Sequence, residues 1–306
     1  MQTQQPVVEW QTLTVMIATY LTLGIATTWL SDLSLPTAIL VTSFAVAQFS
    51  SLQHEVLHGH PFRSRRLSEA AVFLGATIYI PYIRFKDTHL AHHHDPILTD
   101  PYDDPESNFL DPKIWENLPK FQKVLLKANN TLAGRILLGP AVSIWSFVGT
   151  DLRAILNGDR HIRNAWLLHL VGVALMIGWL WATPGMPIWA YLMAAYLGFG
   201  LLKIRTFLEH RAHHLARARS VVIADRGFFA LLFLNNNYHS VHHSHPGLAW
   251  YRLPRAFAQD REHYLARNDG YFYANYREIF WRYFFRAKDV VPHPLWTQAG
   301  KRPDLD

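Results

Sequence analysis

Most histidines of this chain are grouped rather than scattered. Fourteen of the 18 fall in four short clusters. The clusters read HEVLHGH (54–60), HLAHHH (89–94), EHRAHH (209–214) and YHSVHHSH (238–245). Because residues i, i+3 and i+4 of a helix project from one face, the spacing within each cluster aims two or three imidazoles at a common point. This pattern is typical of a metal site.

The number of clustered imidazoles indicates more than one metal ion. Roughly nine or more nitrogens exceed the four ligands of a tetrahedral zinc site and fit two ions of higher coordination number. Imidazole binds zinc, copper, iron and nickel, so the ligand type alone leaves the metal open. The isolated histidines are interpreted as structural or surface residues: His161, His169, His263 and His293.

Two other classes of protein are considered as distant alternatives. HEVLH fits the zinc-protease signature H-E-x-x-H, in which Glu55 would be the general base. An intramembrane zinc protease leaves the other three clusters unexplained, however. A metal transporter places ionisable residues at mid-membrane, whereas these histidines lie at the ends of apolar segments.

Basic residues are confined to two stretches of the chain. None of the 29 Lys and Arg residues occurs before Arg63 or between Arg163 and Lys203. Apolar segments of about 20 residues are long enough to cross a bilayer, and Lys and Arg collect in cytoplasmic loops. The sequence therefore predicts membrane spans at about 11–30, 35–53, 165–183 and 187–208.

These spans predict two hairpins. Their turns, SDLS (31–34) and PGMP (184–187), carry no cation and are expected on the extracytoplasmic side. Residues 54–164 and 209–306, and with them all four histidine clusters, are then cytoplasmic. The expected fold is an all-α integral membrane protein of one domain (1–306), with a cytoplasmic helical cap that holds the metal site. The stretch 69–83 is expected to be interfacial or re-entrant, and 131–148 interfacial.

The chain contains no cysteine, which excludes disulfides, thiolate zinc sites and an intrinsic iron–sulfur cluster. The net charge of +6 lies on the side predicted to be cytoplasmic. Such a face attracts anionic lipid headgroups or an acidic redox partner. No nucleic-acid partner is expected.

The clusters resemble the three histidine boxes of the membrane fatty acid desaturase superfamily, whose members are non-haem di-iron enzymes. HEVLH (54–58), HLAHH (89–93) and HSVHH (239–243) match its patterns H-x(3–4)-H, H-x-x-H-H and [HQ]-x-x-H-H, and the resemblance covers about residues 35–250. It implies one further ligand in FLEHRAHH (207–214), assigned to His210 with His213 or His214 as alternatives. The implied iron ligands are His54, His58, His89, His92, His93, His210, His239, His242 and His243.

The resemblance also implies the activity. Two non-haem iron ions would use O2 as co-substrate to oxidise an unactivated C–H bond in a lipid acyl chain, and fatty acid desaturation is the predicted outcome. Hydroxylation or ketolation of a lipid, carotenoid or alkane by the same centre is the alternative, since HPGLAWYRLP (245–254) is similar to carotenoid ketolases and to some bacterial desaturases. A separate ferredoxin, rubredoxin or cytochrome is expected to supply electrons at the basic face.

Four residues near the boxes are candidates for support of the ligands. Glu55, Asp95 and Glu209 adjoin box histidines, and as hypotheses they orient imidazole N–H groups. The asparagine that the family carries ahead of its third box corresponds to Asn235.

Overall fold

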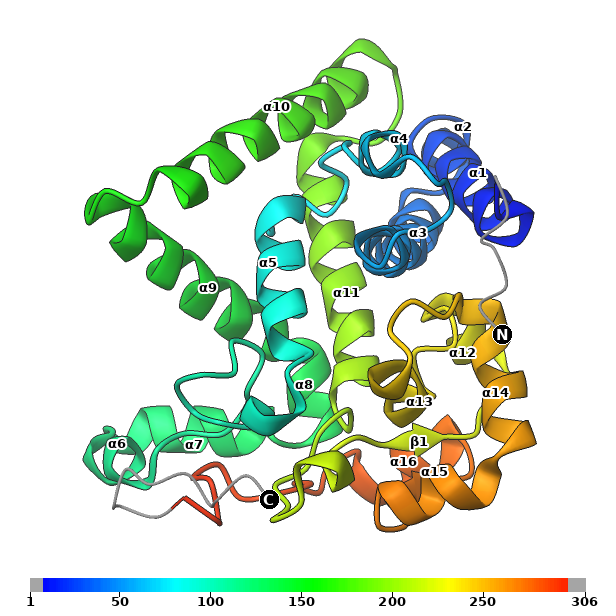
Figure 1. The fold of residues 1–306 in the computed structure, drawn as a ribbon. Helices are drawn as coiled ribbons and strands as arrows, with labels where there is room; N and C mark the ends of the chain where they lie inside the picture. Colours follow the sequence, from blue (N-terminus) through cyan, green and yellow to red (C-terminus); the bar gives the residue numbers. More distant parts are fainter. Residues whose placement is uncertain (1–7, 297–306) are drawn as a thin grey trace.

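The computed structural model describes residues 8–296, and helices are the main regular structure in this part of the chain. Four apolar helical segments are long enough to cross a membrane: α1 with α2 (Trp10–Thr27 and Trp29–Leu33), α3 (Leu35–Leu57), α10 (Arg160–Ala182) and α11 (Ile188–Thr206). They coincide with the four predicted spans, which confirms the all-α prediction and the four apolar helices. α3 packs against both α1 and α11, whereas α10 leans away from the other three (Figure 1).

Two of these helices extend beyond the apolar segments. α3 continues past the predicted end at 53 because HEVL contains good helix formers, so His54 lies on the helix and His58 is its C-cap. α10 begins at Arg160, before the predicted start, because the Asp159 carboxylate accepts a hydrogen bond from the Ile162 N–H (2.9 Å) and caps the helix. The extension of α3 carries the first histidine box to the end of a rigid element.

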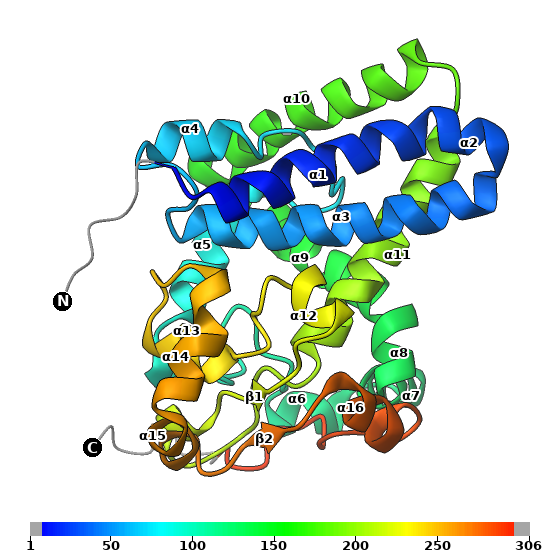
Figure 2. The ribbon, with the colours of Figure 1, turned by 90° about the vertical axis from the view of Figure 1, so that its right-hand side faces the viewer.

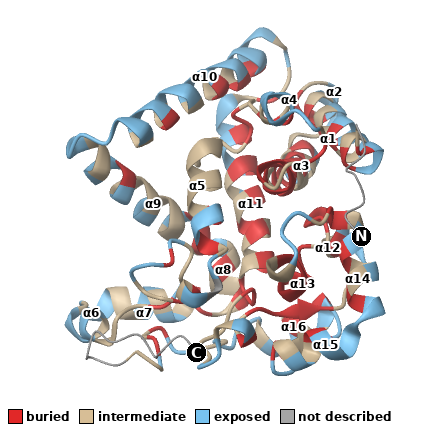
Figure 3. Ribbon diagram, viewed as in Figure 1, coloured by how far each residue is buried: buried red, intermediate tan, exposed pale blue. Residues whose placement is uncertain are grey.

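The other helices, apart from α9 with its 18 residues, are shorter and lie mostly in a second layer, beside the layer of apolar helices (Figure 2). They are α4 (Arg65–Ala70), α5 (Tyr82–His92), α6 (Pro112–Asn117), α7 (Lys120–Asn129), α8 (Leu132–Leu137), α9 (Gly139–Leu156), α12 (Phe228–Leu232), α13 (His239–Ser244), α14 (Leu253–Gln259), α15 (Arg261–Arg267) and α16 (Tyr276–Tyr283). Two short strands, β1 (Val222–Ile223) and β2 (Phe272–Tyr273), pair in parallel. Buried residues concentrate in α3, α11, α13 and β1, and α10 and α15 are largely exposed (Figure 3).

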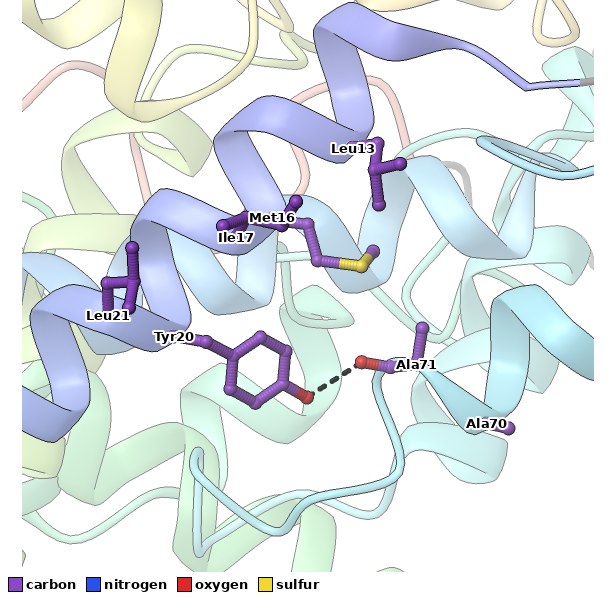
Figure 4. Close-up of a pocket in the computed structure, with 7 residues that line it drawn as sticks. All are labelled: Leu13, Met16, Ile17, Tyr20, Leu21, Ala70 and Ala71. Carbon is purple, nitrogen blue, oxygen red and sulfur yellow. Dashed lines mark hydrogen bonds between the residues drawn. The ribbon is translucent and has the colours of Figure 1, made fainter.

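Residues 71–81, between α4 and α5, are irregular, so no helix crosses a membrane here. Three side chains from α1, α11 and α10 donate hydrogen bonds to carbonyls of this segment: Tyr20 to Ala71 (2.7 Å), Tyr191 to Ala76 (2.7 Å) and His169 to Ile78 (2.8 Å). The first of these bonds lies beside a hollow of about 380 Å³ on the apolar face of α1 (Figure 4). Irregular backbone is tolerated at membrane depth only where protein groups satisfy it in this way.

A buried ion pair fixes α5, the helix that carries the second histidine box. Arg84 on α5 donates from Nε and Nη2 to the two carboxylate oxygens of Asp151 on α9, each at 3.0 Å. Trp166 on α10 donates from Nε1 to the same carboxylate (2.8 Å). Asp151 is buried, so removing either partner would leave the other charge poorly hydrated and without its main counter-charge.

Replacing Asp151 with Asn is expected to destabilise the protein by about 3 kcal/mol, because it leaves the Arg84 guanidinium with only the partly exposed Asp87 carboxylate, 3.5 Å away, as a counter-charge. The measurement is the thermal midpoint of the detergent-solubilised protein. Arg65→Gln is the control: it removes an ion pair with Glu69 in which the arginine is 60% exposed, and its effect is expected to stay within about 1 kcal/mol. Equal midpoints for the two variants would show that the Arg84–Asp151 pair does not hold α5 in place.

Candidate metal centre

The structure brings all nine implied ligands together from four separate segments: the end of α3, α5, the residues after α11, and α13. They form two groups, and within each the nitrogens that could bind an ion all lie within 4.8 Å of one another. The five-histidine group contains His54, His58, His89, His93 and His242. The four-histidine group contains His92, His210, His239 and His243.

Each H-x-x-H-H box divides its histidines between the two groups. On α5, the i, i+4 pair His89 and His93 enters the five-histidine group, and His92 enters the other. On α13, the i, i+4 pair His239 and His243 enters the four-histidine group, and His242 enters the first. Positions i and i+4 differ by about 40° around a helix, whereas i+3 lies about 60° to the other side. One box therefore serves two adjacent sites, rather than the single point expected from its spacing.

The ring nitrogens have a consistent orientation. Their Nε2 atoms face one another in the pairs His92–His210 (2.8 Å), His89–His93 (2.9 Å), His210–His239 (3.0 Å) and His93–His242 (3.1 Å). Nδ1 atoms instead bond outward to surrounding groups: His92 to Asp104 (2.8 Å), His89 to Glu106 (3.1 Å), His210 to Ser220 (3.2 Å) and His239 to Asn236 (3.2 Å).

This orientation fits bound metal. When a side-chain oxygen accepts the Nδ1 proton of a neutral imidazole, the Nε2 atom carries a lone pair, and two lone pairs that face each other need a proton or a metal ion between them. Two nitrogens about 2.1 Å from one ion, at right angles, lie about 3 Å apart, as these do. The buried Nε2 atoms of His54 and His58 also have no hydrogen-bond partner among the described residues. An all-imidazole set suits a transition metal such as iron and not magnesium or calcium.

Most of the ligand candidates outside the apolar helices are held neutral. Burial, reinforced by neighbouring imidazoles, lowers the pKa of His58 to about 2. The same causes hold the pKa values of His210, His239 and His242 well below the usual range. A neutral imidazole is the form that binds a metal ion.

His92 is the exception because two carboxylates flank it. Burial alone would lower the pKa of His92, but the charges of Glu106 and Asp104 outweigh it and raise this pKa to about 9. A metal ion must therefore displace a proton from His92 when it binds. Although burial opposes it, the proximity of His92 and His89 lowers the pKa of Glu106 well below its usual range, so this carboxylate stays ionised.

Residues 220–223 hold the loop after α11 against α13. Ser220 pairs with His210 in an isolated β-bridge, and the Val221 N–H donates to the Glu209 carbonyl (3.1 Å). The Ser240 N–H on α13 donates to the Val221 carbonyl (2.8 Å). This backbone ladder sets the separation of His210 from the histidines of α13.

Glu55 and Glu209 lie near the imidazoles that they were expected to orient, but beyond hydrogen-bond distance. Each has one carboxylate oxygen 3.7 Å from an Nδ1 atom, Glu55 beside His54 and Glu209 beside His239. Glu55 accepts a hydrogen bond from the Trp250 N–H (3.2 Å) instead. Glu209 accepts one from Asn236 Nδ2 (3.3 Å), so it acts on His239 through this amide.

The asparagine that contacts the third box is Asn236 rather than Asn235. Asn235 donates from Nδ2 to the Trp250 carbonyl (3.2 Å). Its neighbour Asn236 is buried and places Oδ1 against Nδ1 of His239. The side chain of Asp95, the remaining candidate, lies outside the described residues.

Two residues that hydrogen-bond to the candidate ligands were not predicted from the sequence. Asp104 and Glu106 lie in the Pro- and Asp-rich loop 95–108, and their carboxylates accept the Nδ1 protons of His92 and His89. Asp104 also accepts hydrogen bonds from the backbone N–H groups of Thr99 (2.8 Å) and Glu106 (2.9 Å). A run of carboxylates shortly after a histidine box was the available signal.

The other clustered histidines lie outside both groups. His94, His214 and His245 are exposed. His213 is 3.3 Å from an Asp269 carboxylate oxygen, so His210 is the member of its cluster that the geometry favours. His60 is buried with Nδ1 2.9 Å from a Glu9 carboxylate oxygen.

Replacing Asp104 with Asn is expected to lower the affinity for iron by about 10–100-fold, the usual cost of losing a partner that orients a metal-bound imidazole. An amide has one acceptor oxygen and cannot serve both the His92 imidazole and the Thr99 N–H. Iron retention against a chelator measures the effect. Glu116→Gln, at an exposed carboxylate on α6, is the control and is expected to retain iron as the unaltered protein does. Equal retention by both variants would rule out support of His92 by Asp104.

The family model described as fatty acid desaturase matches residues 10–275, which is most of the chain. The chain therefore belongs to the fatty acid desaturase family, a family of oxidoreductases, as the histidine boxes indicated. None of the curated proteins matches it. Family membership and the two histidine groups together support oxidation of a lipid at a histidine-rich metal centre.

Proposed function

We propose that the protein is a membrane di-iron enzyme that desaturates a lipid acyl chain with O2. The observation that carries this proposal is the pair of adjacent all-histidine groups, which divide two H-x-x-H-H boxes between them. The five-histidine group would hold one non-haem iron ion and the four-histidine group the other. Nine histidines in this arrangement exceed the needs of the single zinc of a protease.

The chain prepares this site for two ions. When bound, the irons supply the activation of O2 that removal of hydrogen from an unactivated C–H bond requires. Asp104, Glu106 and Asn236 hold the Nδ1 protons of their histidines, which keeps Nε2 directed inward. Burial of His54, His89, His92, His239 and His242 keeps bulk water away. Desaturation would combine O2, two external electrons, two protons and two hydrogens of the acyl chain to give two water molecules.

The proposed topology is two membrane hairpins with the site on the cytoplasmic side. The first box and His210 follow the apolar parts of α3 and α11, at the helix ends opposite the cation-free turns after α2 and α10. Basic residues flank these same ends, as the positive-inside rule requires of cytoplasmic segments. The whole chain then acts as one desaturase-like domain. A separate ferredoxin, rubredoxin or cytochrome would deliver electrons to its basic face.

Metal and lipid analysis test the proposal together. The purified protein is expected to contain about two irons per chain, and zinc without iron would refute the di-iron centre. Lipids of a host that expresses the protein are expected to gain a double bond, seen as the loss of two hydrogens in the mass of the acyl chain. The gain of an oxygen atom would instead establish hydroxylation or ketolation by the same centre.

A further inference from the structure

Several short helices outside the four apolar segments expose large apolar side chains. On α16, Trp281 is 92% exposed, and Phe285 just beyond the helix is 84% exposed. On α7, the exposed fractions of Phe121 and Val124 are 69% and 68%. Leu137 on α8 and Phe228 and Leu231 on α12 are also exposed. Clustered exposure of this kind marks a surface that binds an apolar partner.

One set of contacts places α8 beside the apolar part of α11. The Tyr196 hydroxyl donates to the Leu137 carbonyl at the end of α8 (2.6 Å). Gly200 allows the close approach, since a Cβ there would lie 2.6 Å from the Ile136 carbonyl oxygen. Both residues precede Lys203, the first cation of this region, so α8 lies at the depth of apolar sequence.

A second set of contacts places α16 beside α3 through α12. The Phe228 ring on α12 packs edge-on against Phe44, within the apolar sequence of α3, with 5.3 Å between centroids. The next residue, Phe229, stacks on Phe280 of α16 at 5.8 Å. Two independent routes thus connect these short helices to the sides of candidate membrane helices.

α7, α8 and α16 lie near one another at one edge of the second layer (Figure 2). The Ala133 N–H on α8 donates to the Phe284 carbonyl just after α16 (2.9 Å), and Asn130 Nδ2 after α7 donates to the Asp289 carbonyl (2.6 Å). Exposed cations accompany the apolar side chains on this edge: Lys120, Lys127, Arg277, Arg282 and Arg286. Aromatic rings beside Lys and Arg are typical of helices that lie in the interface of an anionic bilayer.

We propose that α7, α8, α12 and α16 form an interfacial surface that extends from the acyl region of the membrane, at α8 and α12, to the headgroup region, and that it binds anionic phospholipid. Its apolar side chains reach the acyl boundary and its arginines and lysines contact lipid phosphates. The occupant is lipid because α12 and α8 pack against the apolar sequence of α3 and α11, two of the helices that are long enough to cross a membrane. This surface is distinct from the metal centre and sets how deeply the second layer sits in the membrane.

The absence of cysteine makes depth measurement direct. A spin label on Trp281→Cys or Val124→Cys, in vesicles of phosphatidylcholine and phosphatidylglycerol, is expected to collide with O2 and to be shielded from a water-soluble nickel complex. A label on Glu262→Cys, on the exposed face of α15, is the control and is expected to show the reverse. Equal nickel accessibility at 281, 124 and 262 would overturn the interfacial position.

A charge variant tests lipid preference separately. From mixed vesicles, the purified protein is expected to retain phosphatidylglycerol several-fold over phosphatidylcholine. The double variant Arg282→Gln with Arg286→Gln, which changes two exposed arginines of this surface, is expected to bring this ratio towards one. The control double variant Arg255→Gln with Arg261→Gln, on α14 and α15, is expected to retain the ratio of the unaltered protein. Equal ratios in both variants would refute anionic-lipid binding by this surface, and unchanged iron content would separate the result from any failure at the metal centre.

Discussion

Replacing His242 with alanine is expected to abolish lipid oxidation and to reduce the iron content from about two ions per chain to between one and two. His242 is buried, and its Nε2 atom lies 3.1 Å from that of His93 in the five-histidine group. Four imidazoles of that group remain after the change. His239→Ala leaves only three in its own group and is expected to lose its ion more completely. Iron per chain and oxidised lipid are measured on the same preparations.

His245→Ala is the matched control. It changes a histidine of the same cluster that is exposed and outside both groups, and is expected to retain full iron content and activity. Size-exclusion profiles of all three variants would separate loss of metal from loss of fold. The assignment of the third box fails if His245→Ala loses as much iron as His242→Ala, or if neither loses any.

Patterns that depend on nearby residues alone were sufficient to predict the apolar helices and the histidine clusters. Hydropathy and the exclusion of Lys and Arg show which segments prefer lipid to water. Each segment predicted in this way is an apolar helical segment in the structure. Helical periodicity placed the histidines of each box close together. The division of each box between two groups was not predicted, because it depends on how α5 and α13 are rotated relative to each other in the folded protein.

Residues that support the ligands were harder to predict, because sequence adjacency is a poor guide to contact on a helix. Glu55 directly follows His54, and successive helical residues point about 100° apart, which leaves the 3.7 Å separation. Leu234 and Asn235 both adopt positive φ angles, of 47° and 53°, and the resulting turn directs the next residue, Asn236, at His239. The contacts of Asp104 and Glu106 with the histidines depend on the path of a loop, and composition does not specify that path.

Residues 73–75 cross α10 with their backbone directly against the backbone of that helix. A Cβ added at Gly172 would lie 2.5 Å from the Phe73 carbonyl oxygen, and one added at Gly75 would lie 2.5 Å from the Val173 nitrogen. Backbone atoms oppose backbone atoms here, so no flexible side chain can move to relieve the contact. In membrane proteins, small residues are what allow backbones to approach this closely.

Gly172→Ala is therefore expected to lower the thermal midpoint, with a cost at or above the about 1–3 kcal/mol of ordinary overpacking. The segment that it displaces leads through Pro81 directly into α5, so the second histidine box moves with it and iron content falls too. Gly178→Ala on the same helix is the control: nothing lies within 4 Å of its Cβ, and alanine favours a helix by about 1 kcal/mol over glycine. Its midpoint is expected to hold or rise. If both variants were equally stable and equally rich in iron, the glycine crossing would not be what positions α5, and the Arg84–Asp151 ion pair would have to do so alone.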